Sequence, residues 1–271
     1  MLLFGCATRV TFPTATPDKP TPIKSWLVRP DGDGPFPAVV LMHGCHGVVK
    51  QTFTWAEWLA RRGYVALVVD SYGPRGEPAD CQEGPPGDQT PQNRFADAMG
   101  ALRYLQGQAF VKADRVAVMG WSQGGVIAMA VINGPSLERA RRRGVDMPQS
   151  GYAAAIALYP GGCESLVTEL VVRPLLLLLA ADDDWTPLRH CQAMVEAMRS
   201  RGAAITMVVY PGAYHYFDVT GQKREVLMSV PNSEKAGGRG VTVAYQRAAA
   251  EDAYGQVDVF LLRQLKGIPA R

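Results

Sequence analysis

The sequence predicts an α/β fold in which helices cover both faces of a mainly parallel central sheet. Short runs that are apolar throughout alternate with stretches whose apolar residues recur at helical spacing. Strands buried on both faces have this continuous apolar pattern, and intervening helices favour parallel pairing with right-handed crossovers. A length of 271 residues and a hydrophobic content of 47% suit one large domain.

The order of the elements follows from these patterns and from turn residues between them. We expect strands over residues 37–42, 64–70, 115–120, 152–159, 174–181 and 205–210, and helices over 54–62, 90–106, 124–133, 187–201 and 244–265. Residues 71–90 are rich in Gly, Pro and polar side chains, which predicts a long loop. Ligands of such sheets bind beyond the carboxyl ends of the strands, so we expect functional residues in the turns after strands.

Charge and hydropathy exclude some classes of function. The formal net charge of +3 is small and the Lys and Arg residues are scattered, so we expect no nucleic-acid partner. The one basic run is interpreted as a solvated helix end: Arg139, Arg141, Arg142 and Arg143. No stretch approaches the roughly 20 apolar residues that a membrane-spanning helix needs.

The N-terminal residues allow two interpretations. Residues 3–6, Leu-Phe-Gly-Cys, are similar to the end of a bacterial lipoprotein signal, in which the Cys is lipidated, but the charged start and longer apolar run are missing. With a truncated signal, Cys6 would carry a lipid anchor in the periplasm or envelope; if the match is chance, the protein would be cytoplasmic. We expect residues 1–22 to be a tail with a Thr- and Pro-rich tether, and residues 23–271 to form the domain.

The five cysteines include no C-x-x-C pair, so a zinc ribbon or a dithiol redox site is not expected. If Cys6 is lipidated, four remain that an exported protein could pair: Cys45, Cys81, Cys163 and Cys191. Buried thiols are the alternative, and the sequence does not give the connectivity.

The candidate nucleophile is Ser122, in the G-x-S-x-G pattern Gly120-Trp-Ser-Gln-Gly124. An apolar run precedes it and a helical stretch follows, which is the strand–turn–helix setting that this pattern requires. The sharp turn would project the serine hydroxyl above the sheet, and the helix start would direct N–H groups at developing negative charge. The pattern and its setting predict the α/β-hydrolase fold.

The candidate base is His215, in the turn after the last predicted strand. A serine hydroxyl needs a base to remove its proton, and the chain has four histidines: His43, His46, His190 and His215. The order Ser, acid, His fits His215. His190 also follows the acid, but its place in a helix fits the role poorly.

The candidate acid is Asp183, with Asp184 as the alternative. The base needs a carboxylate on its other ring nitrogen. Asp182, Asp183 and Asp184 follow a predicted strand, and three adjacent carboxylates cannot all be buried, so we expect one to point inward. Glu164, after the preceding strand, is a weaker candidate.

The early turn His43-Gly-Cys-His-Gly47 is the candidate oxyanion loop. The backbone N–H groups of Cys45 and Gln123 would bind the oxyanion. A metal site at His43 and His46 is the rival interpretation, weakened by the lack of a carboxylate partner. We expect neither metal nor cofactor.

Several segments, taken together, resemble the dienelactone hydrolase family of α/β-hydrolases over about residue 23 to the C-terminus. The matching segments are residues 35–45, 59–64, 69–71, 120–125, 183–187 and 210–215. The family's acid lies four residues before the proline of residues 183–187, which supports Asp183. Two departures are Ser122, where the founding enzymes use Cys, and the polar, Gly-rich insertion of residues 220–240, interpreted as a flexible lid or a disordered segment.

The predicted function is hydrolysis of ester, lactone or thioester bonds of a small substrate through an acyl-enzyme on Ser122. An acyltransferase of the same fold and a non-catalytic binding or envelope-tethered protein are the alternatives. Aromatic residues that flank the site could form an apolar wall, although core packing explains each of them as well: Tyr72, Trp121, Trp185, Tyr214 and Tyr216.

Overall fold

The apolar runs form an eight-stranded sheet in the computed structural model, which describes residues 7–16, 20–77, 81 and 90–268. The strands are β1 (Thr8–Pro13), β2 (Pro22–Val28), β3 (Phe36–Met42), β4 (Val65–Val69), β5 (Val111–Trp121), β6 (Ala154–Leu158), β7 (Leu175–Ala180) and β8 (Ile205–Tyr210), and a separate hairpin comprises β9 (Glu225–Pro231) and β10 (Arg239–Val243). The helices are α1 (Lys50–Arg61), α2 (Thr90–Gln106), α3 (Gln123–Ala130), α4 (Gly134–Arg142), α5 (Leu188–Arg199) and α6 (Arg247–Leu261).

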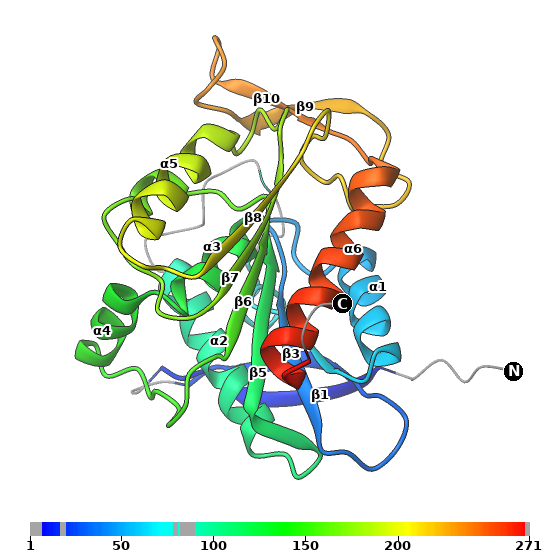
Figure 1. Cartoon of the computed structure of the whole chain (residues 1–271), viewed down its shortest axis with the longest axis vertical. Helices are drawn as coiled ribbons and strands as arrows, with labels where there is room; N and C mark the ends of the chain where they lie inside the picture. Colours follow the sequence, from blue (N-terminus) through cyan, green and yellow to red (C-terminus); the bar gives the residue numbers. More distant parts are fainter. Residues whose placement is uncertain (1–6, 17–19, 78–80, 82–89, 269–271) are drawn as a thin grey trace, which may run out of the picture.

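The strand order β1-β2-β4-β3-β5-β6-β7-β8 confirms the predicted fold class. Every neighbouring pair from β4-β3 to β7-β8 is parallel, and the pairs β1-β2 and β2-β4 at one edge are antiparallel. The carboxyl ends of the parallel strands therefore meet at one rim of the sheet, below the β9–β10 hairpin at the top of Figure 1.

Both faces of the sheet are covered, as the continuous apolar runs predict. Along β5, Val116 and Val118 face the core layer that contains side chains of α2, α3 and α5, while Ala117 and Met119 face the layer that contains side chains of α1 and α6. Figure 1 shows these two groups of helices on opposite sides of the sheet. A strand whose successive side chains are all buried can lie only inside such a sandwich.

The N-terminal boundary of the domain is corrected by β1. Residues 8–13 belong to the predicted tail and tether, yet they pair with β2 in register from Thr8↔Leu27 to Pro13↔Pro22. Phe12 is buried with 2% exposure, which fixes the strand against the core. Proline is tolerated at an edge strand because no ladder hydrogen bond is required of it there. The candidate end of a lipoprotein signal, residues 3–6, lies outside the described residues.

Most of the insertion of residues 220–240 forms a β-hairpin, which corrects the expectation of a disordered segment, while the flexible lid stays a prediction. β9 and β10 pair antiparallel, and their register shifts between Arg239 and Val241. Val230 and Val241 are buried while Val226 and Met228 are exposed. The irregularity breaks the alternation of apolar and polar residues by which a strand is recognised in sequence.

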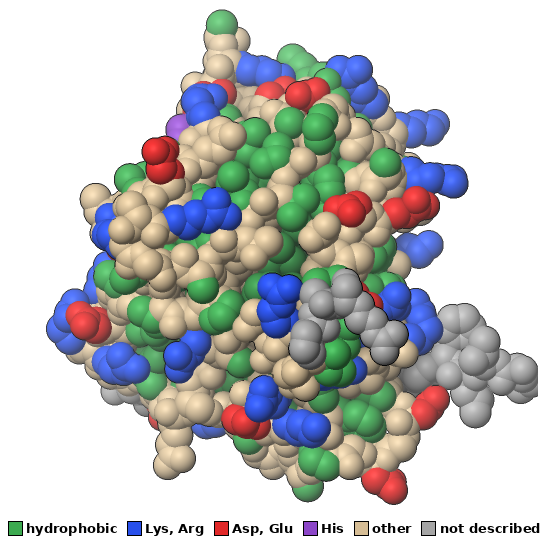
Figure 2. Space-filling view, in the orientation of Figure 1, with side chains coloured by type: hydrophobic (Ala, Val, Ile, Leu, Met, Phe, Trp, Pro, Cys, Tyr) green, Lys and Arg blue, Asp and Glu red, His purple; other side chains and the backbone are tan. Residues whose placement is uncertain are grey.

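Charged side chains lie mostly on the surface. The basic run is confirmed as an exposed helix end, at the last turn of α4. On the face shown in Figure 2, Lys and Arg side chains are spread over several elements, with Asp and Glu between them. Within the described residues, no helix combines the length and apolar character needed to cross a membrane.

The described cysteines are paired as Cys45–Cys81 and Cys163–Cys191. This resolves the connectivity that the sequence left open. The second disulfide closes a loop with a sequence separation of 28 residues and joins the turn after β6 to α5. Restricting the unfolded chain in this way stabilises the folded state.

We expect the double variant Cys163→Ala, Cys191→Ala to lose about 3 kcal/mol of unfolding free energy, because its unfolded chain regains the entropy of the open loop. Urea unfolding followed by circular dichroism measures the loss. A variant as stable as the oxidised wild type would contradict this account of the disulfide.

Candidate functional site

The predicted site residues follow different strands but share one rim of the sheet. Cys45 follows β3, Ser122 follows β5, Asp183 follows β7 and His215 follows β8. Because these strands are parallel, all of these turns lie at their carboxyl ends. The topology alone therefore brings together residues that lie far apart in the chain.

Ser122 occupies a sharp turn between β5 and α3. Its backbone angles, φ 50° and ψ −117°, lie where residues other than glycine are rarely found. The neighbouring glycines allow this turn: a side-chain carbon on Gly124 would lie 2.0 Å from the carbonyl oxygen of Met42, and one on Gly120 would lie 2.1 Å from that of Gly124. The sequence pattern around Ser122 thus has a steric cause.

Backbone strain is concentrated at this rim. Among the described residues, the non-glycine positions with positive φ are Ser122, Tyr159 and Tyr216. The rings of Tyr159 and Tyr216 both pack against the ring of His215, with centroids 4.4 Å and 4.9 Å away. Strained residues persist only where surrounding contacts hold them, and they are concentrated at functional sites.

Asp183 and His215 form a buried pair. The Nδ1 atom of His215 lies 2.7 Å from Oδ2 of Asp183. The Asp183 side chain is 1% exposed and the His215 side chain 0%. The carboxylate also accepts hydrogen bonds from the N–H groups of Trp185 and Thr186 and from the Thr186 hydroxyl. With its Nδ1 engaged, the ring presents Nε2 as its other polar atom.

The Nε2 atom of His215 is buried and has no hydrogen-bond partner among the described residues. A buried polar atom without a partner is unusual in a folded protein and suggests a functional use. The ring is enclosed by Tyr159 and Trp185, whose centroids lie 4.4 Å and 4.6 Å from its own. The imidazole is therefore fixed in orientation while one of its nitrogens stays unused.

Ser122 and His215 each contact the end of β6. The N–H of Ser122 donates to the carbonyl of Leu158 over 3.0 Å, and the next residue, Tyr159, packs on the His215 ring. The structure therefore places both predicted residues against the same strand end, rather than on opposite sides of the molecule.

The loop after β3 lies beside the serine turn. A side-chain carbon on Gly44 would lie 3.7 Å from Cβ of Ser122. The Gly44 carbonyl accepts hydrogen bonds from Nδ1 of His43 and from the N–H of Gly47. Since C=O and N–H point in opposite directions across a trans peptide, these bonds orient the N–H of Cys45 away from them. Gln123 is the first residue of α3, so its N–H has no acceptor within the helix.

His43 positions this loop and is not suited to bind a metal. Its Nδ1 donates to the Gly44 carbonyl, and its Nε2 accepts from the N–H of Ser71 over 3.2 Å. Burial, with a smaller effect of the Arg94 charge, lowers the pKa of His43 to about 3, so the ring is neutral at physiological pH. With both nitrogens engaged, the rival metal site at His43 and His46 lacks a ligand.

Arg94, which no sequence pattern singled out, lies beneath the same loop. It is 2% exposed, and its guanidinium donates to the His43 carbonyl and to Oε1 of Gln123. The Tyr72 hydroxyl donates to that same oxygen over 2.7 Å. Burial lowers the pKa of Arg94. The sequence showed only an arginine in a helix, and its burial depends on how α2 packs under the two turns.

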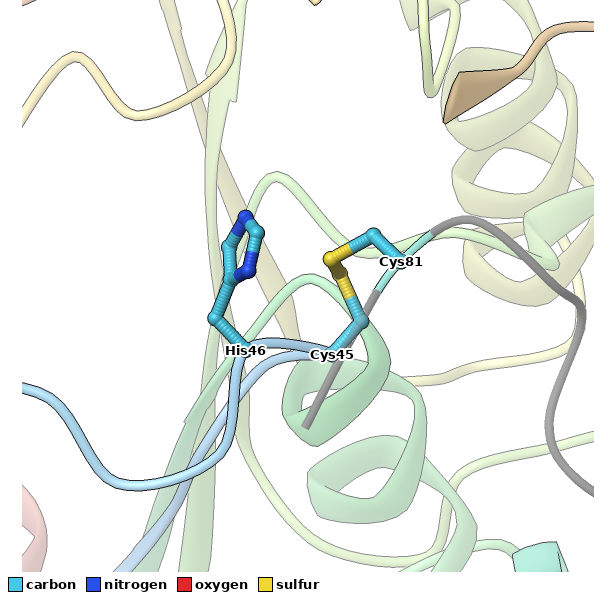
Figure 3. A group of neighbouring side chains, drawn as sticks. All are labelled: Cys45, His46 and Cys81. Carbon is cyan, nitrogen blue, oxygen red and sulfur yellow. A yellow bond between two sulfur atoms is a disulfide. The ribbon is translucent and has the colours of Figure 1, made fainter. Parts of the chain in front are cut away.

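The Cys45–Cys81 disulfide joins the loop after β3 to the segment between η1 (Gly73–Arg75) and α2 (Figure 3). It packs with Val230 and Val241 of the β9–β10 hairpin. His46 lies beside the two sulfur atoms, but a disulfide supplies no thiolate and therefore makes a poor metal site.

Asp184 has different contacts from Asp183. Its carboxylate accepts from the N–H and hydroxyl of Thr242, both over 2.7 Å, and pairs with Lys235. These contacts attach the hairpin to the acid loop.

His190 and Glu164, the weaker candidates for base and acid, face each other at 3.8 Å and lie outside the buried pair of Asp183 and His215. The other ring nitrogen of His190 lies 3.4 Å from Glu234. Neither residue therefore joins the predicted site.

The flanking aromatic residues divide into two groups. Trp185 and Tyr216 contact the His215 ring, with ring centroids 4.6 Å and 4.9 Å from its own. Trp121 is a core residue with 2% exposure, Tyr72 packs on His43, and Tyr214 lies beneath the Arg224 guanidinium.

The fold is that of the α/β-hydrolases, and comparison with known proteins gives the family. Residues 23–265 match the dienelactone hydrolase family, to which this chain belongs. The chain is 26% identical over 200 residues to a protein of Bradyrhizobium sp named as a probable 2-oxo-3-(5-oxofuran-2-ylidene)propanoate lactonase, with 71% of this chain and 78% of that protein covered.

Solved structures of related enzymes share the fold. A dienelactone hydrolase-like promiscuous phosphotriesterase from metagenomic libraries superposes with a TM-score of 0.67 at 20% identity, covering 96% of this chain and 98% of its own. Esterase 2 of Thermogutta terrifontis, phosphorylated by paraoxon, gives a TM-score of 0.67 at 16% identity, covering 99% and 97%.

Variants of the two neighbouring aspartates test whether Asp183 is the catalytic acid and Asp184 only an anchor of the hairpin. We expect Asp183→Asn to lower kcat by about 10⁴-fold, because the amide no longer stabilises an imidazolium or fixes its tautomer. Asp184→Asn should leave kcat close to wild type while loosening the hairpin. Steady-state ester hydrolysis and limited proteolysis measure the two effects, and equal kcat values for the two variants would refute the assignment.

Proposed function

We propose that the protein is a serine hydrolase that cleaves carboxylic ester or lactone bonds of small substrates through an acyl-enzyme on Ser122. The observation that carries the proposal is the buried His215, whose Nδ1 lies 2.7 Å from Asp183 and whose Nε2 has no partner among the described residues. The His215 ring packs at the strand end against which Ser122 is held in a strained turn. A base that a buried carboxylate orients, and whose other ring nitrogen is unpaired, supports this role, because a serine needs such a base for activation.

In the first step, Oγ of Ser122 attacks the carbonyl carbon of the substrate while its proton passes to Nε2 of His215. The N–H groups of Cys45 and Gln123 donate to the resulting oxyanion, a contribution that is typically worth about 3 kcal/mol per donor. The buried Asp183 carboxylate stabilises the imidazolium through Nδ1. Collapse of the intermediate breaks the bond to the leaving alcohol, which takes the proton from Nε2.

In the second step, water attacks the acyl group on Ser122. His215 accepts a proton from this water and returns it to Oγ as the acid product leaves. The chain supplies every group that these steps use. His43 does not compete for the proton, because burial lowers its pKa to about 3 and both of its ring nitrogens are engaged.

The relatives support esters and lactones as the substrate class. The Bradyrhizobium protein is named as a lactonase, and the Thermogutta protein is an esterase that paraoxon phosphorylates. Trp185 and Tyr216 beside His215 would present an apolar surface to the acyl group.

We expect a fluorophosphonate probe to label the wild type, and short-chain p-nitrophenyl esters or lactones to be hydrolysed. Ser122→Ala should abolish labelling, and His215→Ala should lower kcat by about 10⁴-fold or more. Folded wild-type protein that the probe does not label would refute the proposal. Product analysis in the presence of alcohols separates hydrolysis from acyl transfer.

The Cys45–Cys81 disulfide provides a second test, because it restrains the loop that carries a proposed oxyanion donor. We expect the double variant Cys45→Ala, Cys81→Ala to lose about tenfold in kcat, since a loosened N–H no longer meets the oxyanion. The matched variant Cys163→Ala, Cys191→Ala should lose stability without this loss of kcat. Identical kcat values in the two double variants would show that the disulfide does not act on the site.

A further inference from the structure

A buried carboxylate lies behind the proposed catalytic residues and takes no part in the steps above. Asp218 is 3% exposed and lies three residues after His215 in the same turn. Its oxygens accept from the Tyr159 hydroxyl over 2.7 Å, from the indole N–H groups of Trp55 and Trp121 over 2.9 Å each, and from Nε2 of Gln51.

Two of these donors come from strand ends that hold the site, and the other two, Gln51 and Trp55, come from α1. Trp121 directly precedes Ser122. Tyr159 follows Leu158, whose carbonyl accepts the Ser122 N–H, and its ring packs on His215. The Asp218 carboxylate therefore connects the turn of the proposed base to the two strand ends that fix the proposed nucleophile.

The carboxylate has no cationic partner among the described residues. All of its donors are neutral side chains. Burial raises the pKa of the Asp218 carboxyl, while the hydrogen bonds act in the opposite direction. Buried charges are costly, and a well-packed apolar side chain often stabilises a core as well or better. Stability alone is therefore a weak reason for an aspartate here.

Backbone strain at the rim of the sheet is a stronger reason for an aspartate at position 218. Ser122 and Tyr159 have φ values of 50° and 36°, and such conformations need surrounding contacts that fix them. The carboxylate bonds the side chain of Tyr159 itself and that of Trp121, the residue before Ser122. The same carboxylate therefore bonds the strained Tyr159 directly and the residue next to the strained Ser122.

We propose that Asp218 is a positioning residue that holds the turn carrying His215 in register with the strand ends carrying Ser122. This inference rests on the proposed hydrolase function. It adds a residue that contacts no substrate atom and acts by setting the separation and orientation of Nε2 and Oγ. A displacement of about 1 Å between reacting groups can lower a rate about 100-fold.

A matched pair of variants tests the proposal. Trp121→Phe and Trp55→Phe each remove one indole N–H from the same Oδ2 atom at the same 2.9 Å, but Trp121 adjoins Ser122 whereas Trp55 belongs to α1. We expect Trp121→Phe to lower kcat about tenfold with KM within about twofold, and Trp55→Phe to keep kcat. Both should lower the unfolding midpoint by similar amounts.

Asp218→Asn extends the test, because an amide offers one acceptor oxygen where two accept now. We expect a loss of about 100-fold in kcat, again with little change in KM, in protein counted by active-site titration. If this variant does not fold, the tryptophan pair still decides. Wild-type kcat in Trp121→Phe, or equal kcat losses in the two tryptophan variants, would overturn the positioning role.

Measurements on the wild-type protein distinguish a failure of this inference from a failure of the proposed hydrolase function. If wild-type protein shows no labelling that depends on Ser122, the hydrolase function itself fails. If wild type is labelled and hydrolyses esters while Trp121→Phe matches it in kcat, the hydrolase function stands and the role of Asp218 alone is rejected.

Discussion

The hydrogen bond between Asp183 and His215 is the interaction on which the rest of the site depends. It lies in the protein interior, with both side chains almost fully excluded from solvent. In that setting the carboxylate needs donors, and the backbone of Trp185 and Thr186 supplies them. The imidazole is then held by one nitrogen, and the other is left for chemistry. The proposed reaction follows from this asymmetry, since a base must be both oriented and unoccupied.

The buried residues around the proposed catalytic groups are unusually polar for a protein core. Arg94 lies under the loop after β3 and Asp218 lies within the turn after β8. Both are buried, and each contacts the backbone or a side chain beside a proposed catalytic group. Both charged groups bond carbonyl, amide, indole or hydroxyl groups rather than each other, and Nε of Arg94 has no hydrogen-bond partner among the described residues. Buried polar networks can rigidify a site. We interpret them as the support that holds a strained serine turn in place.

The β9–β10 hairpin and the Cys45–Cys81 disulfide form the other side of the site. Asp184 and the packing of Val230 and Val241 attach the hairpin to the acid loop and to the disulfide. The loop that carries the proposed oxyanion donor is thus restrained from a direction that the central sheet alone does not provide. Substrate contacts of this particular chain are expected to depend on this added layer.

The predictions that succeeded and those that failed differ in physical origin. The central strands could be predicted because burial on both faces requires continuous apolar runs, and the fold class followed from their alternation with helices. β1 was missed because its Thr- and Pro-rich sequence resembles a tether, and its pairing depends on a partner strand. The hairpin was missed because a register shift breaks its alternation. Arg94 and Asp218 carry no local pattern at all.

The sequence by itself determined the parallel sheet, the turn at Ser122 and the set of residues at strand ends, because periodicity and glycine placement are local and steric. Only the tertiary structure decided which of the adjacent aspartates faces His215, which cysteines pair, and which charged side chains are buried behind the site. Those outcomes depend on contacts between residues far apart in the chain, where a small rotation of one strand end exchanges an inward side chain for an outward one. Local sequence does not encode that rotation, because the packing of the whole sheet fixes it.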